Sequence, residues 1–182
     1  EAADLFSETA KRELASIYRS DCSLIISEFE IDVLMKTFNI EESLLYYLPF
    51  LIADYSIEAV KEFKPFEERS DFIIVGNLLH APNVDSLLYL KKEIWPSIRK
   101  QLPEAKMSVY GDYAPQQIME LQDKATGFLI EGWAEDIAAI MKSSRVCLAP
   151  IRFGAGLKGK LIDAMINGTP SVTTSIGAEG LH

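Results

Sequence analysis

Short apolar segments alternate with helical stretches along residues 71–174 of this 182-residue chain, and this alternation restricts its fold more than any other feature. The segments are continuous hydrophobic runs, which are typical of a parallel sheet buried on both faces. The expected strands are 72–75, 107–110, 128–131, 146–149 and 171–174, and the expected helices are 82–102 (interrupted at Pro96), 115–123, 134–142 and 157–167. The sequence therefore predicts an α/β fold: a Rossmann-like open parallel sheet with helices on both faces.

Glycines follow the expected strands, at Gly76, Gly111, Gly132 and, shortly after Pro150, Gly154. In open α/β sheets, ligands bind at the carboxyl ends of the strands, beside a switch in strand order. Small residues there leave room for a ligand to approach the backbone, although tight turns also favour glycine. We therefore include Gly76 and Gly154 among the candidate binding residues.

A shorter α/β segment precedes the sheet. Within it, a capping box of Ser27 and Glu30 predicts the start of one helix. The other expected elements are a helix over 3–18, with Leu5, Phe6, Leu14, Ile17 and Tyr18 on its buried side, a short buried strand over 22–26 and a short apolar strand over 44–48. Prolines and charged residues are frequent in 49–70, so we assign 1–64 and 65–182 to separate domains.

The composition excludes several classes of protein. Hydrophobic residues make up 48% and charged residues 25%, as in soluble globular proteins, and no apolar run is long enough to span a membrane. A net charge of −9 argues against a nucleic-acid partner. Cys22 and Cys147 lie in apolar runs and are expected to be buried free thiols. No metal site is expected, because the two cysteines and two histidines lack ligand spacing.

The charge is distributed unevenly. Residues 1–70 carry 15 acidic and 7 basic side chains, a net of −8, and 71–182 carry the remaining 12 and 11, a net of −1. Between Asp136 and Asp163 there is no acidic residue, but there are five cations: Lys142, Arg145, Arg152, Lys158 and Lys160. An acid-free cationic segment in an acidic chain indicates a small anionic ligand, with chance clustering on a solvated face as the alternative.

Within this segment, three glycines and three cations stand at the expected start of the helix 157–167. Lysine in a first helical turn opposes the helix dipole, an arrangement that favours an anion between the backbone N–H groups and the lysine side chains. We therefore predict a phosphate-binding loop that contains Lys158 and Lys160 and presents Asp163 to a polar group. Arg152 either holds phosphate as well or pairs with Asp136.

Two nucleotide-binding motifs match this loop in part. Residues 154–159 fit the dinucleotide pattern G-x-G-x-x-G, but they follow the fourth strand of the sheet, and the second half-sheet that a dinucleotide needs is not expected. Residues 154–160 fit G-x-x-x-x-G-K, but Leu161 stands where a P-loop has Ser or Thr to hold magnesium. Both patterns are therefore weaker interpretations than an anion site of another kind.

From Ala149 to Leu181, the sequence resembles the donor-nucleotide-binding region of group 1 (GT4-type) retaining glycosyltransferases of the GT-B fold. The residues that carry the resemblance are Ala149-Pro150, Phe153-Gly154, Lys158, Lys160, Asp163-Ala164, Gly168-Thr169-Pro170-Ser171-Val172 and Gly177-Ala178-Glu179-Gly180-Leu181. The resemblance extends back through the strand-end glycines, and Cys22–Leu34 is similar to the last strand and helix of the family's first domain.

The resemblance implies a domain that binds a UDP- or GDP-sugar, in an enzyme that transfers the sugar with retention to a glycan or another acceptor. No metal or cofactor is then expected. Lys160 and Lys158 would neutralise the diphosphate and stabilise it as it leaves. Asp163 would hold the ribose hydroxyls, and the backbone around Trp133 would meet the base. Glu179 would either meet the sugar or cap the following helix.

Two departures from the family pattern leave alternatives open. Ala155 stands where the family has the first Glu of an E-x7-E pair, and Asn77 stands where many relatives have Arg. The missing Glu favours a non-catalytic Rossmann-like module that binds an anion, a nucleotide or a protein partner. A nucleotide-sugar epimerase is a further alternative, with His80 as the histidine available for acid/base chemistry.

The chain begins at Glu1, so we expect an excised piece whose 65–182 domain is truncated at its C-terminus. Such a fragment is expected to be inactive alone. Residues 1–64, the remnant of a first domain, leave a homodimer open. The resemblance implies a cytoplasmic protein and leaves open a peripheral position on the inner face of a membrane.

Overall fold

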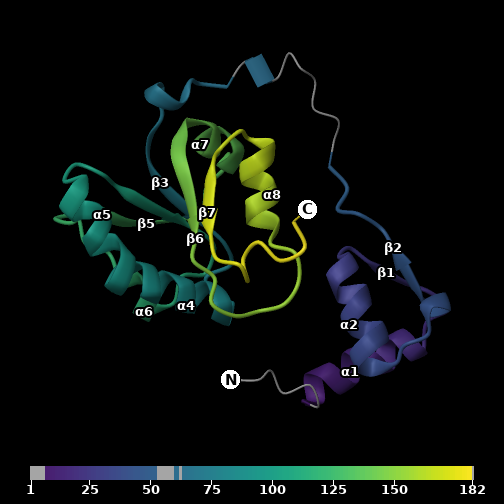
Figure 1. Cartoon of the computed structure of the whole chain (residues 1–182). Coiled ribbons are helices and arrows are strands. Elements are labelled where there is room, and N and C mark those ends of the chain that lie inside the picture. The colour runs from purple at the N-terminus through teal and green to yellow at the C-terminus, as the bar shows by residue number, and fades with distance from the viewer. Residues whose placement is uncertain (1–6, 53–59, 62, 182) are drawn as a thin grey trace. The chain divides into compact units, whose positions relative to one another are not determined.

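The computed structural model describes residues 7–52, 60–61 and 63–181. The chain divides into two compact units, residues 1–53 with 180–182 and residues 54–179 (Figure 1). The second unit contains the predicted sheet. The assignment of residues 1–64 to the end of a first domain stays a prediction.

A five-stranded parallel sheet with the strand order β5-β4-β3-β6-β7 forms the second unit, as predicted. Its strands are β3 (Ser70–Val75), β4 (Met107–Tyr110), β5 (Phe128–Gly132), β6 (Ser144–Ala149) and β7 (Ser171–Thr173). Phe72 of β3 pairs with Met107 on one side and Val146 on the other. The order of strands therefore reverses between β3 and β6, which is the switch point where open α/β sheets bind ligands.

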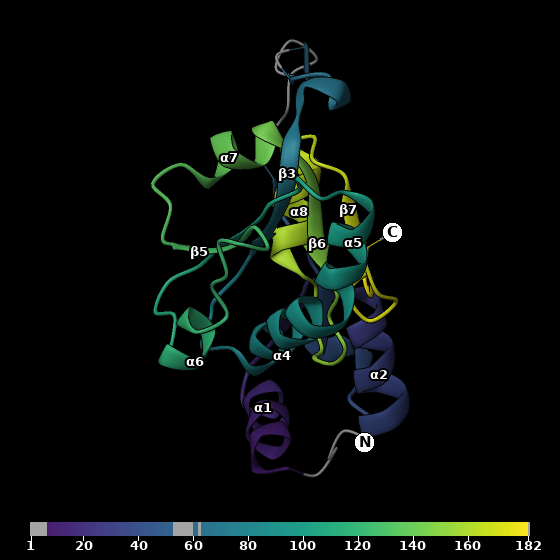
Figure 2. The same cartoon turned by 90° about the vertical axis from the view of Figure 1, so that its left-hand side faces the viewer.

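Helices cover both faces of this sheet, as predicted (Figures 1 and 2). They are α4 (Ala81–Tyr89), the π-helical turn η3 (Leu90–Ile94), α5 (Trp95–Gln101), α6 (Gln116–Met119), α7 (Ile137–Ser143) and α8 (Gly159–Ile166), and a 3-10 turn η2 (Phe66–Glu68) precedes β3. Ile74 packs with side chains of α4, η3, α5 and α6, whereas Ile73 packs against Met141 of α7 and Ala164 of α8. Successive residues of a strand face opposite sides, so burial on both faces explains the continuous apolar runs.

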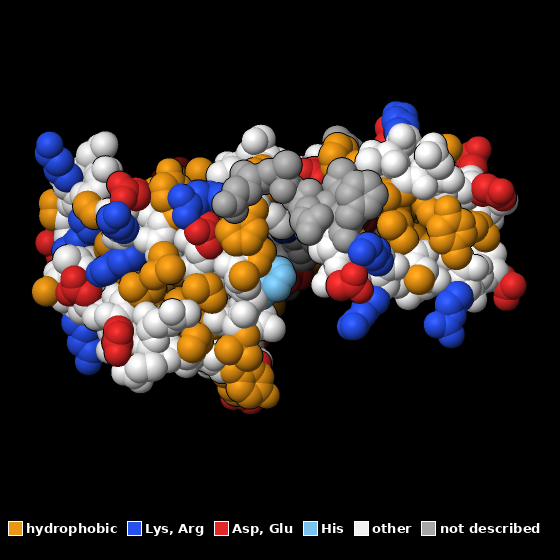
Figure 3. All heavy atoms as spheres, turned by 90° about the horizontal axis from the view of Figure 1, so that it is seen from below, with side chains coloured by type: hydrophobic (Ala, Val, Ile, Leu, Met, Phe, Trp, Pro, Cys, Tyr) orange, Lys and Arg blue, Asp and Glu red, His pale blue; other side chains and the backbone are white. Residues whose placement is uncertain are grey.

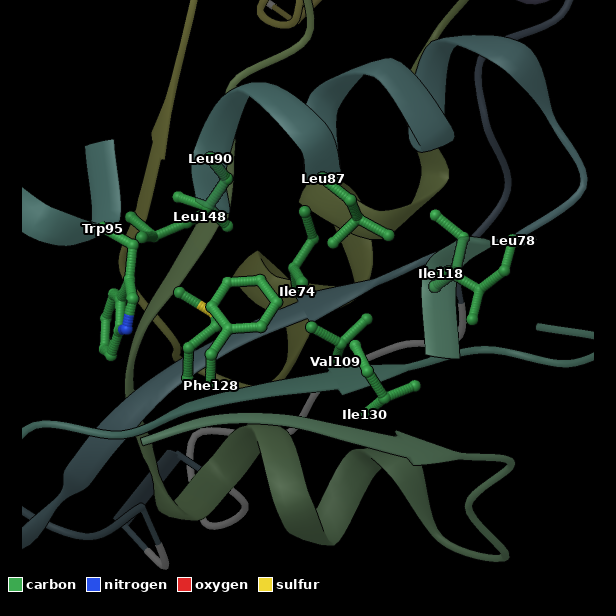
Figure 4. Packing of buried hydrophobic residues seen from close by; sticks show 11 residues of the cluster. Ile74, Leu78, Leu87, Leu90, Trp95, Val109, Ile118, Phe128, Ile130 and Leu148 are labelled. Carbon is green, nitrogen blue, oxygen red and sulfur yellow. The ribbon is translucent and has the colours of Figure 1, made fainter. Parts of the chain in front are cut away.

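The larger core cluster lies between the sheet and the helices α4 to α6 (Figure 4). Trp95 is 1% exposed within it. The indole Nε1 donates a hydrogen bond to the carbonyl oxygen of Thr126 at 2.9 Å. The indole ring packs edge-on against Phe72 and Phe128, with ring centroids 5.9 and 6.1 Å away. Trp95 therefore combines a large buried apolar area with a satisfied polar group.

The helix predicted over 115–123 ends early, at Met119. The reason is a turn around Asp123, whose carboxylate accepts hydrogen bonds from the backbone N–H groups of Ala125 and Thr126 at 3.1 and 3.2 Å. A carboxylate that bonds to the backbone just after itself offers an alternative to the helical pattern.

Local groups also set the bounds of two other helices. The helix predicted over 134–142 begins three residues later, because Asp136 caps it by accepting a hydrogen bond from the N–H of Ala139 at 2.9 Å. The interruption predicted at Pro96 takes the form of η3, which ends two residues before this proline. Proline lacks the N–H that a regular α-helix would use there.

The first unit is smaller and contains two parallel strands. Its elements are α1 (Glu8–Tyr18), β1 (Ser23–Ile25), α2 (Glu28–Phe38), the 3-10 turn η1 (Glu42–Leu44) and β2 (Leu45–Tyr47). Ser27 Oγ accepts a hydrogen bond from the N–H of Glu30 at 3.3 Å, so the predicted helix start is confirmed. Asn39, in the left-handed conformation with φ 53°, ends α2.

Three burial predictions for the first unit are wrong. Tyr18 is 58% exposed, and Cys22 is exposed as well. Leu24, in the middle of the strand predicted to be buried, is 62% exposed. Among the described residues of this unit, α2 covers the face of the strands opposite to Leu24. The predictions for Leu5 and Phe6 fall outside the described residues.

Figure 3 shows the surface seen from below. On this face, Lys and Arg side chains are interspersed with Asp and Glu and do not gather into a continuous basic patch. Within the described parts of the chain, no helix combines the length and the apolar character needed to cross a membrane.

The two tryptophans provide a matched test of the core. We predict that Trp95→Ala lowers the free energy of unfolding by about 3–5 kcal/mol, because it leaves a large cavity and an unpaired carbonyl. Trp133→Ala, at a side chain that is 67% exposed, should change it by less than about 0.5 kcal/mol. Urea unfolding followed by circular dichroism measures both, and equal losses would contradict this account of the core.

Candidate functional site

The candidate site lies at the switch point, where the carboxyl ends of β3 and β6 are neighbours. Gly76 directly follows β3, and residues 150–158 connect β6 to α8. Lys160, in the first turn of α8, extends back to Gly76: a Cβ atom added to this glycine would lie 2.8 Å from the lysine Nζ. Folding therefore brings the predicted glycine and the predicted phosphate-binding lysine together.

Lys160 is a half-buried cation without an acidic partner. Its Nζ donates a hydrogen bond to Oδ1 of Asn83 at 2.5 Å. No carboxylate of the described residues lies within 4.0 Å of it. Burial lowers the pKa of Lys160 to about 8; Cys147 acts to raise this pKa, and the charge of Lys158 acts to lower it. An ammonium group has three donors, so two remain for a ligand.

Lys158 is held by its own loop. Its Nζ donates hydrogen bonds to the carbonyl oxygens of Gly154 at 3.0 Å and Ala155 at 3.2 Å, and to that of Gly156. These contacts tie the loop together ahead of α8. In this arrangement Lys158 contributes the geometry of the loop and a positive charge near Lys160. Its predicted contact with phosphate stays a prediction.

Arg152 pairs with Asp85 of α4, and the predicted alternative of a pair with Asp136 is wrong. Its Nε donates a hydrogen bond to Asp85 Oδ2 at 2.8 Å, and its Nη2 donates to Asp85 Oδ1. The guanidinium also lies 4.6 Å from the ring centroid of Tyr89. The hydrogen bonds from Arg152 lower the pKa of Asp85. Arg152 therefore fastens the loop after β6 to α4, and Asp136 instead caps α7.

Two features of the loop after β6 favour glycine at position 154. The φ of Gly154, +110°, lies in a region that other residues rarely adopt. A Cβ atom here would also lie 3.0 Å from Pro82 Cγ, at the start of α4. The loop after β6 therefore packs closely on the first turn of α4.

Asp163 lies one turn after Lys160 on α8, and residues three apart share one side of a helix. Partial burial raises the pKa of its carboxyl group. Beneath the helix, Cys147 of β6 is buried as predicted, and this burial raises the pKa of its thiol to about 11. Cys147 is therefore an inert thiol of the core, whereas Asp163 is an exposed residue.

A pocket of about 390 Å³ extends from Gly76 along the carboxyl ends of β3, β4 and β5. Its lining includes Tyr110, Gly111, Tyr113 and Trp133. Trp133 is exposed at the pocket, with 67% of its surface accessible. Because Gly76 also lies against Lys160, the pocket and the ammonium flank the same glycine.

Glu179 lies in the loop after β7. Thr174 Oγ1 donates a hydrogen bond to the carbonyl oxygen of Ile151 and accepts one from the N–H of Gly177 at 3.0 Å. These bonds hold the start of this loop beside the carboxyl end of β6. Among the described residues, no hydrogen bond or ion pair joins Glu179 to Lys160.

Two side chains that position this site were not predicted from the sequence. Asn83 and Asp85 both lie in the first half of α4 and bind Lys160 and Arg152. The available signal was their position shortly after Gly76. A helix that follows this strand so closely begins at the same carboxyl edge of the sheet as the site. No cluster of three or more His, Cys, Asp or Glu side chains with metal-binding geometry occurs in the described part of the chain.

Comparison with known proteins identifies the family. The model of the family described as glycosyl transferases group 1 matches residues 69–182. An uncharacterised 44.6 kDa protein in the cps region of Klebsiella pneumoniae is 32% identical over 117 aligned residues, and the match covers 59% of this chain and 30% of that protein.

Solved glycosyltransferase structures share the fold at low sequence identity. TarM of S. aureus, in a complex that contains UDP, aligns with a TM-score of 0.73 and 15% identity over 96% of this chain and 35% of its own. HepE of Anabaena, in complex with UDP and glucose, aligns with a TM-score of 0.68 and 13% identity over 97% of this chain and 51% of its own. WaaG, a glycosyltransferase involved in lipopolysaccharide biosynthesis, gives a TM-score of 0.63 and 18% identity over 97% and 51%.

The chain thus spans between about a third and a half of the length of these relatives. The resemblance to group 1 glycosyltransferases and the GT-B type of fold are confirmed. Since the family model covers well over half of its residues, the chain belongs to the group 1 glycosyl transferases.

Proposed function

We propose that the second unit binds the nucleotide of a UDP- or GDP-sugar, for a glycosyltransferase that transfers the sugar with retention and without a metal ion. The observation that carries this proposal is the half-buried ammonium of Lys160 at the switch point, with an amide as its partner and no carboxylate within 4.0 Å among the described residues. A partly desolvated cation that no acid neutralises is stabilised by binding an anion.

The surrounding groups fit the other parts of such a donor. The diphosphate would lie against Lys160 and the backbone at Gly76, where an added Cβ atom would approach Lys160 Nζ to 2.8 Å. The base would enter the neighbouring pocket beside Trp133, and Asp163 would accept hydrogen bonds from the ribose hydroxyls. The complexes of TarM and HepE with UDP support UDP as the nucleotide.

The chemistry expected of Lys160 follows from charge. When the bond between the anomeric carbon and the phosphate oxygen breaks, the electron pair stays on the oxygen, and negative charge grows on the leaving diphosphate. A fixed ammonium in a partly desolvated site stabilises that charge without reorganising. With a pKa of about 8, Lys160 is mostly protonated at neutral pH and is able to act in this way.

The activity of the whole enzyme is a proposal as well, since the chain spans only part of its relatives. We expect this chain to bind donor nucleotide and to lack transfer activity alone. Ala155, in place of the family's first Glu, bears on contacts to the sugar, while the proposed nucleotide contacts involve other residues. The acceptor would be a glycan or another hydroxyl compound.

We predict that Lys160→Ala lowers the affinity for UDP at pH 7 by roughly ten-fold or more, the scale of one charge-assisted hydrogen bond. Isothermal titration calorimetry in the presence of EDTA measures the affinity, and added magnesium should leave it unchanged. Lys124→Ala, at an exposed lysine in the turn before β5, is the matched control. Unchanged affinity in Lys160→Ala would refute the phosphate role, and binding that depends on magnesium would favour a P-loop mechanism.

We further predict that Asp163→Asn weakens the binding of UDP several-fold and leaves the binding of inorganic pyrophosphate unchanged. A carboxylate accepts two hydroxyl hydrogen bonds more strongly than an amide does, and pyrophosphate has no ribose. The same calorimetric titration compares the two ligands, with Glu104→Gln as an exposed control. An equal loss for both ligands would show that Asp163 acts on the structure of the site instead.

A further inference from the structure

Asn83, in the first turn of α4, is oriented by two hydrogen bonds. Its Oδ1 accepts from Nζ of Lys160 at 2.5 Å, and its Nδ2 donates to the backbone carbonyl of Asn77 at 2.9 Å. A carbonyl oxygen only accepts hydrogen bonds, so the amide nitrogen must face Asn77. The amide oxygen is therefore the atom that faces the ammonium, and the orientation of the side chain is fixed.

The pair of Asn83 and Lys160 lies directly on the backbone of Gly76. A Cβ atom on this glycine would lie 2.8 Å from Nδ2 of Asn83 and 2.8 Å from Nζ of Lys160. Both side chains thus meet at the carboxyl end of β3, the central strand. The first half of α4 also contacts the loop after β6, through the ion pair of Asp85 with Arg152. This ion pair fixes α4, which carries Asn83, against the loop that leads to Lys160.

We propose that Asn83 is a positioning residue, which holds the ammonium of Lys160 over Gly76 and leaves two of its N–H donors directed to an anion. This inference rests on the proposed function, in which the anion is the diphosphate of the donor. A neutral acceptor suits this task. A carboxylate would neutralise the charge that the diphosphate needs, and an apolar side chain would leave a half-buried ammonium without an acceptor.

Few charged groups compete with Asn83 for this ammonium. The titratable groups that act on Lys160 are Lys158 in the loop and Cys147 on β6. The carboxylate of α4 at Asp85 is engaged by Arg152, and Lys158 donates to loop carbonyls. A substitution of Asn83 should therefore change the pKa of Lys160 directly.

The experiment measures the reactivity of Lys160 in the whole chain. Trace acetylation with acetic anhydride between pH 6 and 11, followed by peptide mass spectrometry, gives the midpoint at which Lys160 loses its proton, because only the neutral amine reacts. The exposed Lys100 and Lys124 in the same samples are internal standards. The variants are Asn83→Asp and Asn83→Leu, which keep the branched shape of the side chain.

We expect a midpoint near pH 8 for the unmodified chain. Asn83→Asp should raise it and Asn83→Leu should lower it, each by about one pH unit, since one stabilises the charged form and the other removes its acceptor. Both variants should bind UDP more weakly than the unmodified chain at pH 7. Relative to the unmodified chain at the same pH, Asn83→Leu should regain about two-fold in affinity at pH 6, where Lys160 is charged again, and Asn83→Asp should not.

Opposite shifts, together with protection of Lys160 from acetylation by UDP in the unmodified chain, would support the inference. Shifts in the same direction in both variants, or none, would overturn it, because a purely structural role of Asn83 exposes Lys160 similarly in each. Opposite shifts without any protection by UDP would leave the pairing of Asn83 with Lys160 intact. That result would count against the proposed nucleotide function instead.

Discussion

Burial of β3 on both faces is the constraint on which the second unit depends. Ile73 and Ile74 point to opposite core clusters, so helices must cover both sides, and β4 and β6 must pair along both edges. Once the central strand is fixed in this way, the chain order reverses beside it. The loops that follow β3 and β6 then meet at the carboxyl edge of the sheet.

The site is a consequence of that meeting. Lys160 reaches across the switch point to Gly76, and it does so without a carboxylate partner among the described residues. The other cations of the segment are used differently, since Arg152 joins the loop to α4 and Lys158 holds the loop itself. The three cations before and at the start of α8 thus have different positions in space: two of them hold the loop, and Lys160 lies at the switch point.

Much of this fold was predictable, because continuous apolar runs followed by glycine define buried strands without reference to distant residues. The bounds of α6 and α7 were less predictable, since side-chain hydrogen bonds of Asp123 and Asp136 set them. In the site, glycines and lysines followed from the local pattern, whereas the partners of Lys160 and Arg152 did not. These partners, Asp85 and Asn83, are distant in sequence from the two cations. Only the pairing of β3 with β6 brings them close to the cations.

A crystal structure of the chain with UDP tests the central claim most directly. The account predicts a diphosphate oxygen within hydrogen-bonding distance of Lys160 Nζ, close to the backbone of Gly76, with the base in the pocket lined by Trp133. A diphosphate bound by Arg152 and Lys158 while Lys160 stays bonded to Asn83 alone, or a nucleotide bound away from the carboxyl edge of the sheet, would contradict it.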